Sequence, residues 1–185
     1  MLLDIAFLDD ATRPTVPPLA GLTARHKQAG EHLKEVHDHL RDNMRSIRAL
    51  MDRAAAGLAS HGEVADETGR LEMVANFRRF GNLCGQHCQI VNAHHSIEDA
   101  HVFPALAAQS DGYARVTERL AAEHVVVHEL LLRQIDALNA MVTTPGAASF
   151  AEAREIYKAL ERVLASHLGY EEEQIGDALG YFEIF

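Results

Sequence analysis

Long stretches with apolar residues every three or four positions limit the fold of this chain most strongly, because such spacing is typical of amphipathic helices. We expect helices near residues 23–56, 68–108, 112–141 and 150–175. No stretch alternates apolar and polar residues in the manner of a strand, so an all-α fold is expected. The breaks between the last helices are short, which favours an antiparallel, up-down-up-down four-helix bundle.

The ends of this helical region carry local signals. Pro14, Pro17 and Pro18 prevent a helix at the start, because proline lacks the N–H that a helix interior needs. We therefore expect an extended N-terminal arm over residues 1–22, followed by one domain over residues 23–180.

The last helix carries signals at both of its ends. Ser149 and Glu152 have the spacing of a capping box, which predicts the start of the helix there. Gly176 and Gly180 follow its apolar stretch, and glycine commonly terminates helices. We therefore expect the last helix to end near Gly176.

Charge and composition argue against several classes of protein. The chain has 185 residues, and its 17 Lys and Arg against 27 Asp and Glu give a net charge of −10. A surface this acidic repels phosphate backbones, so nucleic acid is not an expected partner. No apolar run reaches the ~18 residues of a membrane span, and the first residues lack the basic segment of a signal peptide. Two cysteines cannot staple a domain of this size, so a cytoplasmic protein is expected.

Histidine is frequent, with 12 residues in the chain, and helical geometry predicts where each one points. Four of them fall within the apolar faces of the first, third and fourth helices: His37, His124, His128 and His167. Glu171 shares the apolar face of the fourth helix, whereas Glu172 lies about 140° away from it.

The second helix presents a histidine and a carboxylate on one face. With His94 taken as the reference direction, Leu83 and Ile90 lie within roughly 60° of it and mark the apolar face. Glu98 falls at about 40°, inside this face, whereas His95 falls at about 100°, on its edge or outside. We therefore expect His94 and Glu98 to point inward and His95 to point away.

Buried carboxylates need a positive partner, because burying an unpaired charge is costly. No Lys or Arg falls on the apolar faces beside Glu98 and Glu171, so a metal ion is the expected source of positive charge. The inward residues also lie at matching distances from the turns, which places them at one height in the bundle. The predicted metal ligands are His37, His94, Glu98, His124, His128, His167 and Glu171.

This set of five imidazoles and two carboxylates is larger than one structural ion needs, since a closed zinc site uses only four ligands. If each carboxylate bridges and an oxygen bridge is added, a pair of octahedral ions retains one open position. That position suits a small ligand. Imidazole with carboxylate suits iron, with manganese or zinc less favoured.

Four motifs, one on each helix, resemble the signatures of hemerythrin-like HHE cation-binding domains: Val36–Arg41, His94–Pro104, Glu123–His128 and His167–Glu172. The resemblance covers roughly residues 30–175. It implies a non-haem centre of two iron ions (Fe–O–Fe), with Glu98 and Glu171 as bridging carboxylates. By the family pattern, the histidines of the first two helices serve one iron and those of the last two serve the other.

The resemblance implies reversible O2 binding, or related peroxide or NO chemistry, with a small diatomic or peroxide ligand as partner. Glu171 follows His167 by four residues, whereas oxygen-carrying hemerythrins have an aspartate at a longer spacing. This difference weakens the case for simple oxygen transport and leaves open whether Glu171 or Glu172 is the bridge. Catalase-like turnover, iron storage and a non-catalytic metal-binding or interaction bundle remain alternatives, and no protein partner is indicated.

Five further residues near the predicted site have open roles. His87 and His101 also point inward, where they either support the ligands, supplement them or move protons. Cys84 and Cys88 are interpreted as buried apolar residues, with a thiol switch as the alternative. Tyr170 either fills the core or hydrogen-bonds a metal-bound oxygen.

Overall fold

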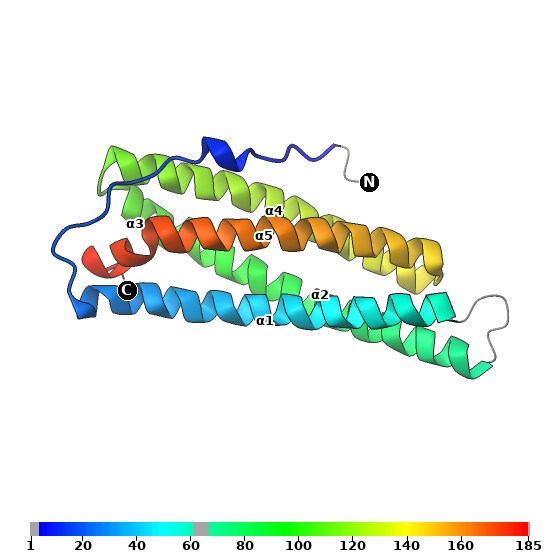
Figure 1. Cartoon of the computed structure of the whole chain (residues 1–185). Helices are drawn as coiled ribbons and strands as arrows, with labels where there is room; N and C mark the ends of the chain where they lie inside the picture. The colour runs from blue at the N-terminus through cyan, green and yellow to red at the C-terminus, as the bar shows by residue number, and fades with distance from the viewer. Residues whose placement is uncertain (1–3, 61–66, 185) are drawn as a thin grey trace.

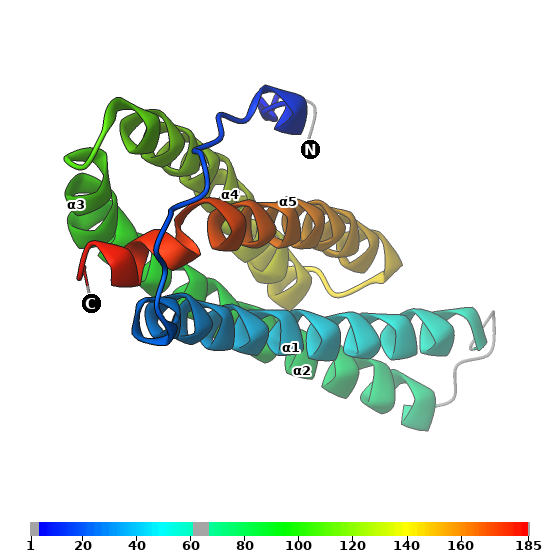
Figure 2. The same cartoon turned by 60° about the vertical axis from the view of Figure 1, so that its left-hand side comes forward.

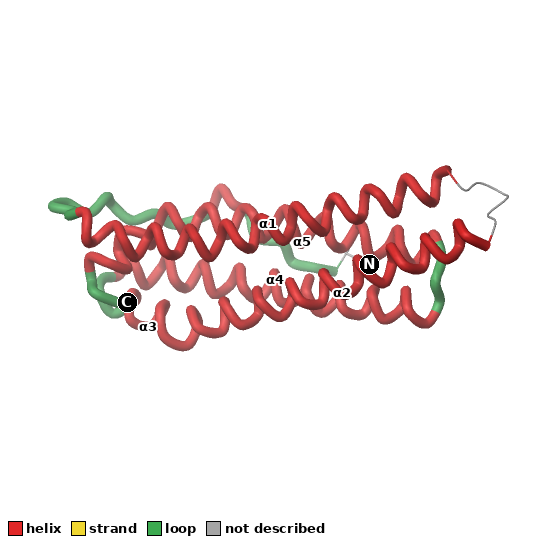
Figure 3. Tube along the Cα trace, turned by 90° about the horizontal axis from the view of Figure 1, so that it is seen from below, coloured by secondary structure: helices red, strands yellow, loops and turns green. Residues whose placement is uncertain are grey.

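The structure, a computed structural model, describes residues 4–60 and 67–184 of the chain. Four long helices lie side by side (Figure 1): α1 (Ala24–Ser60), α2 (Glu67–Ile97), α4 (Asp111–Thr143) and α5 (Ala147–Tyr181). The chain after α2 continues through a π-helical turn, η2 (Glu98–Val102), and a short helix, α3 (Phe103–Ala107). The arm before α1 holds a single 3-10 turn, η1 (Asp10–Thr12). Helices are the only regular elements in the described part of the chain (Figure 3), so the predicted all-α fold is confirmed.

Two apolar clusters fill the space between the helices, and a polar layer separates them. The larger cluster includes Leu40 and Phe80, and the smaller one includes Leu33 and Leu120. On α1, buried His37 lies between Leu33 of the smaller cluster and Leu40 of the larger one. The inward histidines therefore sit inside the protein, between two layers of apolar packing. Within the described residues, no helix is both long and apolar enough to cross a membrane.

Helix α5 continues past both glycines that were expected to end it. It runs to Tyr181, so the prediction of an end near Gly176 is wrong. The glycines instead allow close contact with the start of α1, over which the end of α5 lies (Figure 2). A Cβ at Gly30 would come within 2.8 Å of the Gly176 carbonyl oxygen, and one at Gly180 would overlap the carbonyl oxygen of His26. Close packing of two helix backbones explains these glycines better than helix termination does.

The start of α5 also differs from the prediction. The helix begins at Ala147 with Gly146 as its N-cap residue, so Ser149 lies inside the first turn. The Ser149 hydroxyl donates to the carbonyl oxygens of Thr144 and Gly146, at 2.9 and 3.1 Å. It makes no cap hydrogen bond for the helix, and the predicted capping box of Ser149 and Glu152 is wrong.

The π-helical turn η2 has a cause in the sequence. Pro104 lacks an N–H, and its ring crowds the carbonyl group four residues earlier, which disfavours a regular helical turn here. The N–H of Phe103 bonds instead to the Glu98 carbonyl, five residues back. This wider turn leaves Glu98 and Val102 buried and His101 exposed. The prediction that His101 points inward is therefore wrong, because it assumed a constant 100° per residue.

Candidate metal centre

One cluster of ligand-type side chains, the His37 group, consists of His37, His94, Glu98 and Glu171. One nitrogen or oxygen from each residue lies within 4.8 Å of the others. The Nε2 atoms of His37 and His94 are 3.1 Å apart, and Glu98 Oε1 is 3.1 Å from His94 Nε2. Three different parts of the fold meet here, because His37 comes from α1, His94 and Glu98 from α2 and η2, and Glu171 from α5.

A second cluster, the His124 group, consists of His95, His124 and His167 and meets the same 4.8 Å limit. The Nε2 atoms of His124 and His167 are 3.1 Å apart. The His95 ring stacks on the His124 ring with centroids 3.8 Å apart and planes 7° apart. All three imidazoles are buried.

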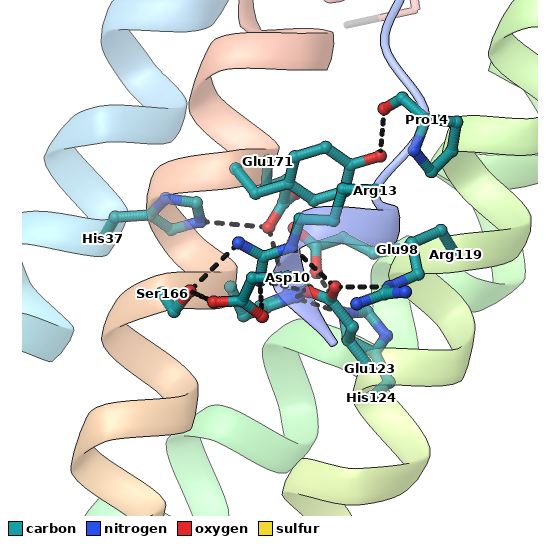
Figure 4. A network of polar contacts seen from close by, with 12 residues as sticks. Asp10, Arg13, Pro14, His37, Glu98, Arg119, Glu123, His124, Ser166 and Glu171 are labelled. Atoms are coloured by element: carbon teal, nitrogen blue, oxygen red, sulfur yellow. Dashed lines mark hydrogen bonds and ion pairs between the residues drawn. The ribbon is translucent and has the colours of Figure 1, made fainter. Parts of the chain in front are cut away.

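The two carboxylates lie between the groups (Figure 4). Glu98 Oε1 faces His94, while its Oε2 is 3.7 Å from His124 Nε2 in the other group. Glu171 Oε2 is 3.5 Å from the Nε2 atoms of both His37 and His167. Each carboxylate thus contacts imidazoles of both groups, which is the arrangement that a bridging ligand needs.

Several buried ligand-type atoms in this centre have no hydrogen-bond partner among the described residues: Glu98 Oε2, both oxygens of Glu171 and both nitrogens of His95. Burial, together with the neighbouring carboxylate, raises the pKa of Glu98, and burial raises the pKa of Glu171 as well. Burial lowers the pKa of His37 and His94 to about 3, so their rings are neutral at pH 7. Neutral imidazoles and carboxylates that lack a positive partner fit a metal cation.

Three imidazoles are held from behind by carboxylates on their Nδ1 atoms. His37 Nδ1 is 2.8 Å from Glu172 Oε1, and His124 Nδ1 is 2.9 Å from Asp99 Oδ1. His167 Nδ1 is 3.1 Å from Glu123 Oε2. A carboxylate that accepts a hydrogen bond from Nδ1–H leaves the Nε2 lone pair free for a metal, and it fixes the direction of the ring.

Glu171 and Glu172, the two alternatives for the bridge, lie in different places. Glu171 is fully buried between the imidazoles. Glu172 lies behind His37, where it also pairs with Arg41 at 2.8 Å. This geometry favours Glu171 as the bridge and gives Glu172 the task of orienting His37.

Glu123 is a functional residue that sequence reasoning missed. Its carboxylate accepts from Arg13 Nε and Nη2 at 2.8 and 2.9 Å, and from Arg119 Nε at 2.7 Å. Burial alone would raise the pKa of Glu123, but the hydrogen bonds from His167, Arg13 and Arg119 bring it down to about 2. Only its place directly before His124 hinted at a role, and nothing in the arm's sequence indicates that Arg13 reaches it.

The structure brings six of the seven predicted ligands into the two groups, and His128 lies beside them. The His128 ring is half-buried, 5.4 Å from the His95 ring, and its Nε2 has no hydrogen-bond partner within the described part of the chain. The placement of His95 on the outer edge is wrong, because this residue is fully buried. Leu83 and Ile90, which served to define the buried face of α2, are each 41% exposed, so that face is centred nearer to His95. The assignment of the seven ligands itself stays a prediction.

The structure describes the surroundings of the remaining residues with open roles. His87 is buried, and neither of its nitrogens has a hydrogen-bond partner in residues 4–60 and 67–184 as far as the structure describes them. Cys84 and Cys88 belong to the larger apolar cluster, where burial raises the pKa of both thiols, that of Cys88 to about 11. Both therefore stay protonated, which fits their interpretation as apolar core residues. Tyr170 donates to the Pro14 carbonyl at 2.6 Å and thus holds the arm.

The all-helical fold and the two His and Glu clusters, which could hold a metal, define a metal-binding helical protein. Residues 28–179 match the family model described as the hemerythrin HHE cation binding domain. The match covers most of the chain, so the chain belongs to this family and the resemblance found in the sequence is confirmed. Searches of the curated proteins and of the solved structures found no match.

Proposed function

We propose that this protein holds two iron ions in a non-haem centre and binds or reacts with O2, peroxide or NO there. The observation that carries the proposal is the position of Glu171, whose Oε2 is 3.5 Å from an imidazole nitrogen of each group. Glu98 divides its two oxygens between the same groups. Two carboxylates placed between two sets of imidazoles support a pair of ions better than a single one.

The ligands divide into two sets under this proposal. His37 and His94 would serve one ion and His124 and His167 the other, with Glu98 and Glu171 shared between them. His95 and His128 are the candidates for the remaining imidazole. When bound, the ions would supply the redox chemistry that small oxygen and nitrogen species require. The chain's own contribution is to hold the rings of His37, His124 and His167 by their Nδ1 atoms and to keep bulk water away.

Access to the centre favours small ligands. The ring of Phe103 stacks on His124 at 5.2 Å between centroids, and the apolar clusters close the layer on both sides. Such packing suits a diatomic molecule or peroxide better than a large organic substrate. It leaves sensing, scavenging and catalase-like turnover as uses of the same site.

Metal analysis of iron-loaded protein tests the proposal. We expect about two irons per chain and a near-ultraviolet absorption band that changes on addition of azide or peroxide. An assay for O2 released from hydrogen peroxide should follow. Tens of irons per chain would indicate an iron store. Zinc without an azide-sensitive band would indicate a non-catalytic bundle.

A matched pair of variants sharpens this test. Glu171→Gln keeps the size of the side chain but removes the charge between the groups, so it should lower the iron content by at least one ion per chain. Glu173→Gln changes a residue of the same helix that is exposed, and it should bind iron normally. Unchanged iron content in Glu171→Gln would contradict the bridging role.

The proposal also includes the antiparallel up-down-up-down arrangement of the helices and a cytoplasmic setting. Contacts of α1 with α2 and α5, and of α4 with α5, support the arrangement, as does the course of the chain in Figure 1. The acidic charge of −10 supports the expectation that nucleic acid is not a partner. Two free, buried cysteines are consistent with a reducing compartment.

A further inference from the structure

The N-terminal arm runs along α4 and α5 (Figure 1), and hydrogen bonds hold it there at several points. Both carboxylate oxygens of Asp4 accept from Arg133 of α4, at 2.7 and 2.9 Å. Further along, the backbone N–H of Val16 donates to the side-chain oxygen of Gln174 on α5 at 3.0 Å. The segment from Asp4 to Val16 is therefore attached to the helices at both of its ends.

Arg13 is the arm residue that contacts Glu123, the carboxylate behind His167 in the metal centre (Figure 4). Its Nε and Nη2 donate to the two oxygens of Glu123 at 2.8 and 2.9 Å, and its Nη1 donates to Ser166 Oγ at 3.0 Å. Its guanidinium lies 4.7 Å from the centre of the Tyr170 ring, and its side chain is only 14% exposed. A planar fork held in this way fixes the orientation of the carboxylate it binds.

The carboxylate of Glu123 transmits this constraint to His167. One oxygen, Oε2, accepts from both Arg13 Nη2 at 2.9 Å and His167 Nδ1 at 3.1 Å. Arg119 donates to the other oxygen, Oε1, at 2.7 Å. Without Arg13, Arg119 would be the remaining cation beside Glu123. It would draw Oε1 toward itself and loosen the hydrogen bond between Oε2 and His167.

The carboxylates behind the other two imidazoles, Glu172 and Asp99, are supported differently. Glu172 pairs with Arg41, a residue of α1 itself, at 2.8 Å. The side chain of Asp99 is 40% exposed, so water can solvate it. Of the three Nδ1 supports described above, the one behind His167 is the one that the arm completes.

We propose that Arg13 is a positioning residue of the metal centre, acting through Glu123 on His167. The inference rests on the proposed di-iron function and extends it, because it makes the N-terminal arm part of the centre. Loss of Arg13 should weaken the binding of the ion in the His124 group, while the ion in the His37 group is retained.

Iron titration of two variants tests this inference. Arg13→Gln removes the fork, whereas Asp4→Asn removes a similar two-bond pair between the arm and α4 without touching Glu123. We expect Arg13→Gln to lower the affinity for the ion of the His124 group by about 10- to 100-fold and to shift the azide-sensitive band, and Asp4→Asn to leave both unchanged. Equal losses in the two variants, or no loss in Arg13→Gln, would overturn the proposal.

A second measurement separates this inference from the proposed function. Long-range 1H–15N NMR spectra of the histidine rings in metal-free protein report which nitrogen of His167 carries the proton. We expect the Nδ1 proton in the unsubstituted protein and in Asp4→Asn, and a mixture of tautomers in Arg13→Gln. An unchanged tautomer in Arg13→Gln would overturn the role of Arg13 whether or not the protein binds iron. A changed tautomer in a protein that takes up no iron would leave that role standing and refute the di-iron function alone.

Discussion

Stripping the metal from this protein should leave it sensitive to mild acid. Burial lowers the pKa of His37 and His94 to about 3, that of His87 to about 4 and that of His124 to about 2. Burial also lowers the pKa of His95 well below its ordinary value. In the unfolded chain these rings take up protons near pH 6.5. Between about pH 4 and 6.5 the unfolded state therefore binds more protons, and the free energy of unfolding falls as the pH falls through this window.

The size of the effect follows from the number of protons. Each buried neutral histidine contributes a slope of ~1.4 kcal/mol per pH unit. Glu98 acts in the opposite direction, because burial and the neighbouring carboxylate raise its pKa to about 11, so it stays protonated in the fold while the unfolded chain releases this proton above about pH 4.5. Burial raises the pKa of Glu171 as well, so Glu171 contributes in the same direction as Glu98. The difference near pH 5.5 is about three protons, or about 4 kcal/mol per pH unit. Total stabilities are about 5–15 kcal/mol, and the loss summed from pH 6.5 to pH 4.5 is about 7 kcal/mol, so acidification over this window would bring the metal-free protein close to unfolding.

Urea denaturation of chelator-treated protein at pH 6.5, 5.5 and 4.5, followed by circular dichroism, measures this slope. His37→Gln should reduce it by ~1.4 kcal/mol per pH unit, because one buried ring is lost. His32→Gln is the matched control on the same helix, since the His32 side chain is 72% exposed. A free energy of unfolding that does not change between pH 6.5 and 4.5 would refute the claim that the imidazoles are buried in neutral form.

Two further predictions concern packing and ligand choice. Gly180→Ala should lower the melting temperature by about 3–10 °C, because the added Cβ overlaps the carbonyl oxygen of His26. Gly169→Ala is the control, since a Cβ there meets open space, and it should keep or raise the melting temperature. Equal melting temperatures for the two variants would contradict the close approach of α1 and α5. His95→Ala should lower the iron content per chain, whereas exposed His101→Ala should leave it unchanged, and full iron content in His95→Ala would exclude His95 as a ligand.

The parts of the centre that could be predicted are those that depend on helical period alone. On α1 and α5 the apolar residues mark one face clearly, so His37 and Glu171 could be placed correctly in the core. On α2 the period is less clear, because apolar residues also occupy the outer surface. Leu83 and Ile90 are exposed there, and including them turned the expected face away from His95.

Two other features lie beyond any pattern of period. The π-helical turn at Glu98 changes the rotation per residue, so every position after it departs from the expected direction. The pairing of Arg13 with Glu123 joins residues 110 positions apart, and no local signal links a proline-rich arm to a helix at that distance. Predicting such a pair requires knowing where the arm lies, which depends on the completed fold.

The same burial that prepares this centre for a metal also makes the empty centre costly. The two oxygens of Glu171 have no hydrogen-bond partner among the residues that the structure describes, and in the absence of a cation its charged form is disfavoured by the surrounding apolar clusters. A cation that binds the folded chain and not the unfolded one stabilises the fold by its binding free energy. Metal affinity and fold stability therefore depend on the same buried groups. Substitutions such as Glu171→Gln, which relieve the empty state, should raise the stability of metal-free protein while they lower its capacity for iron.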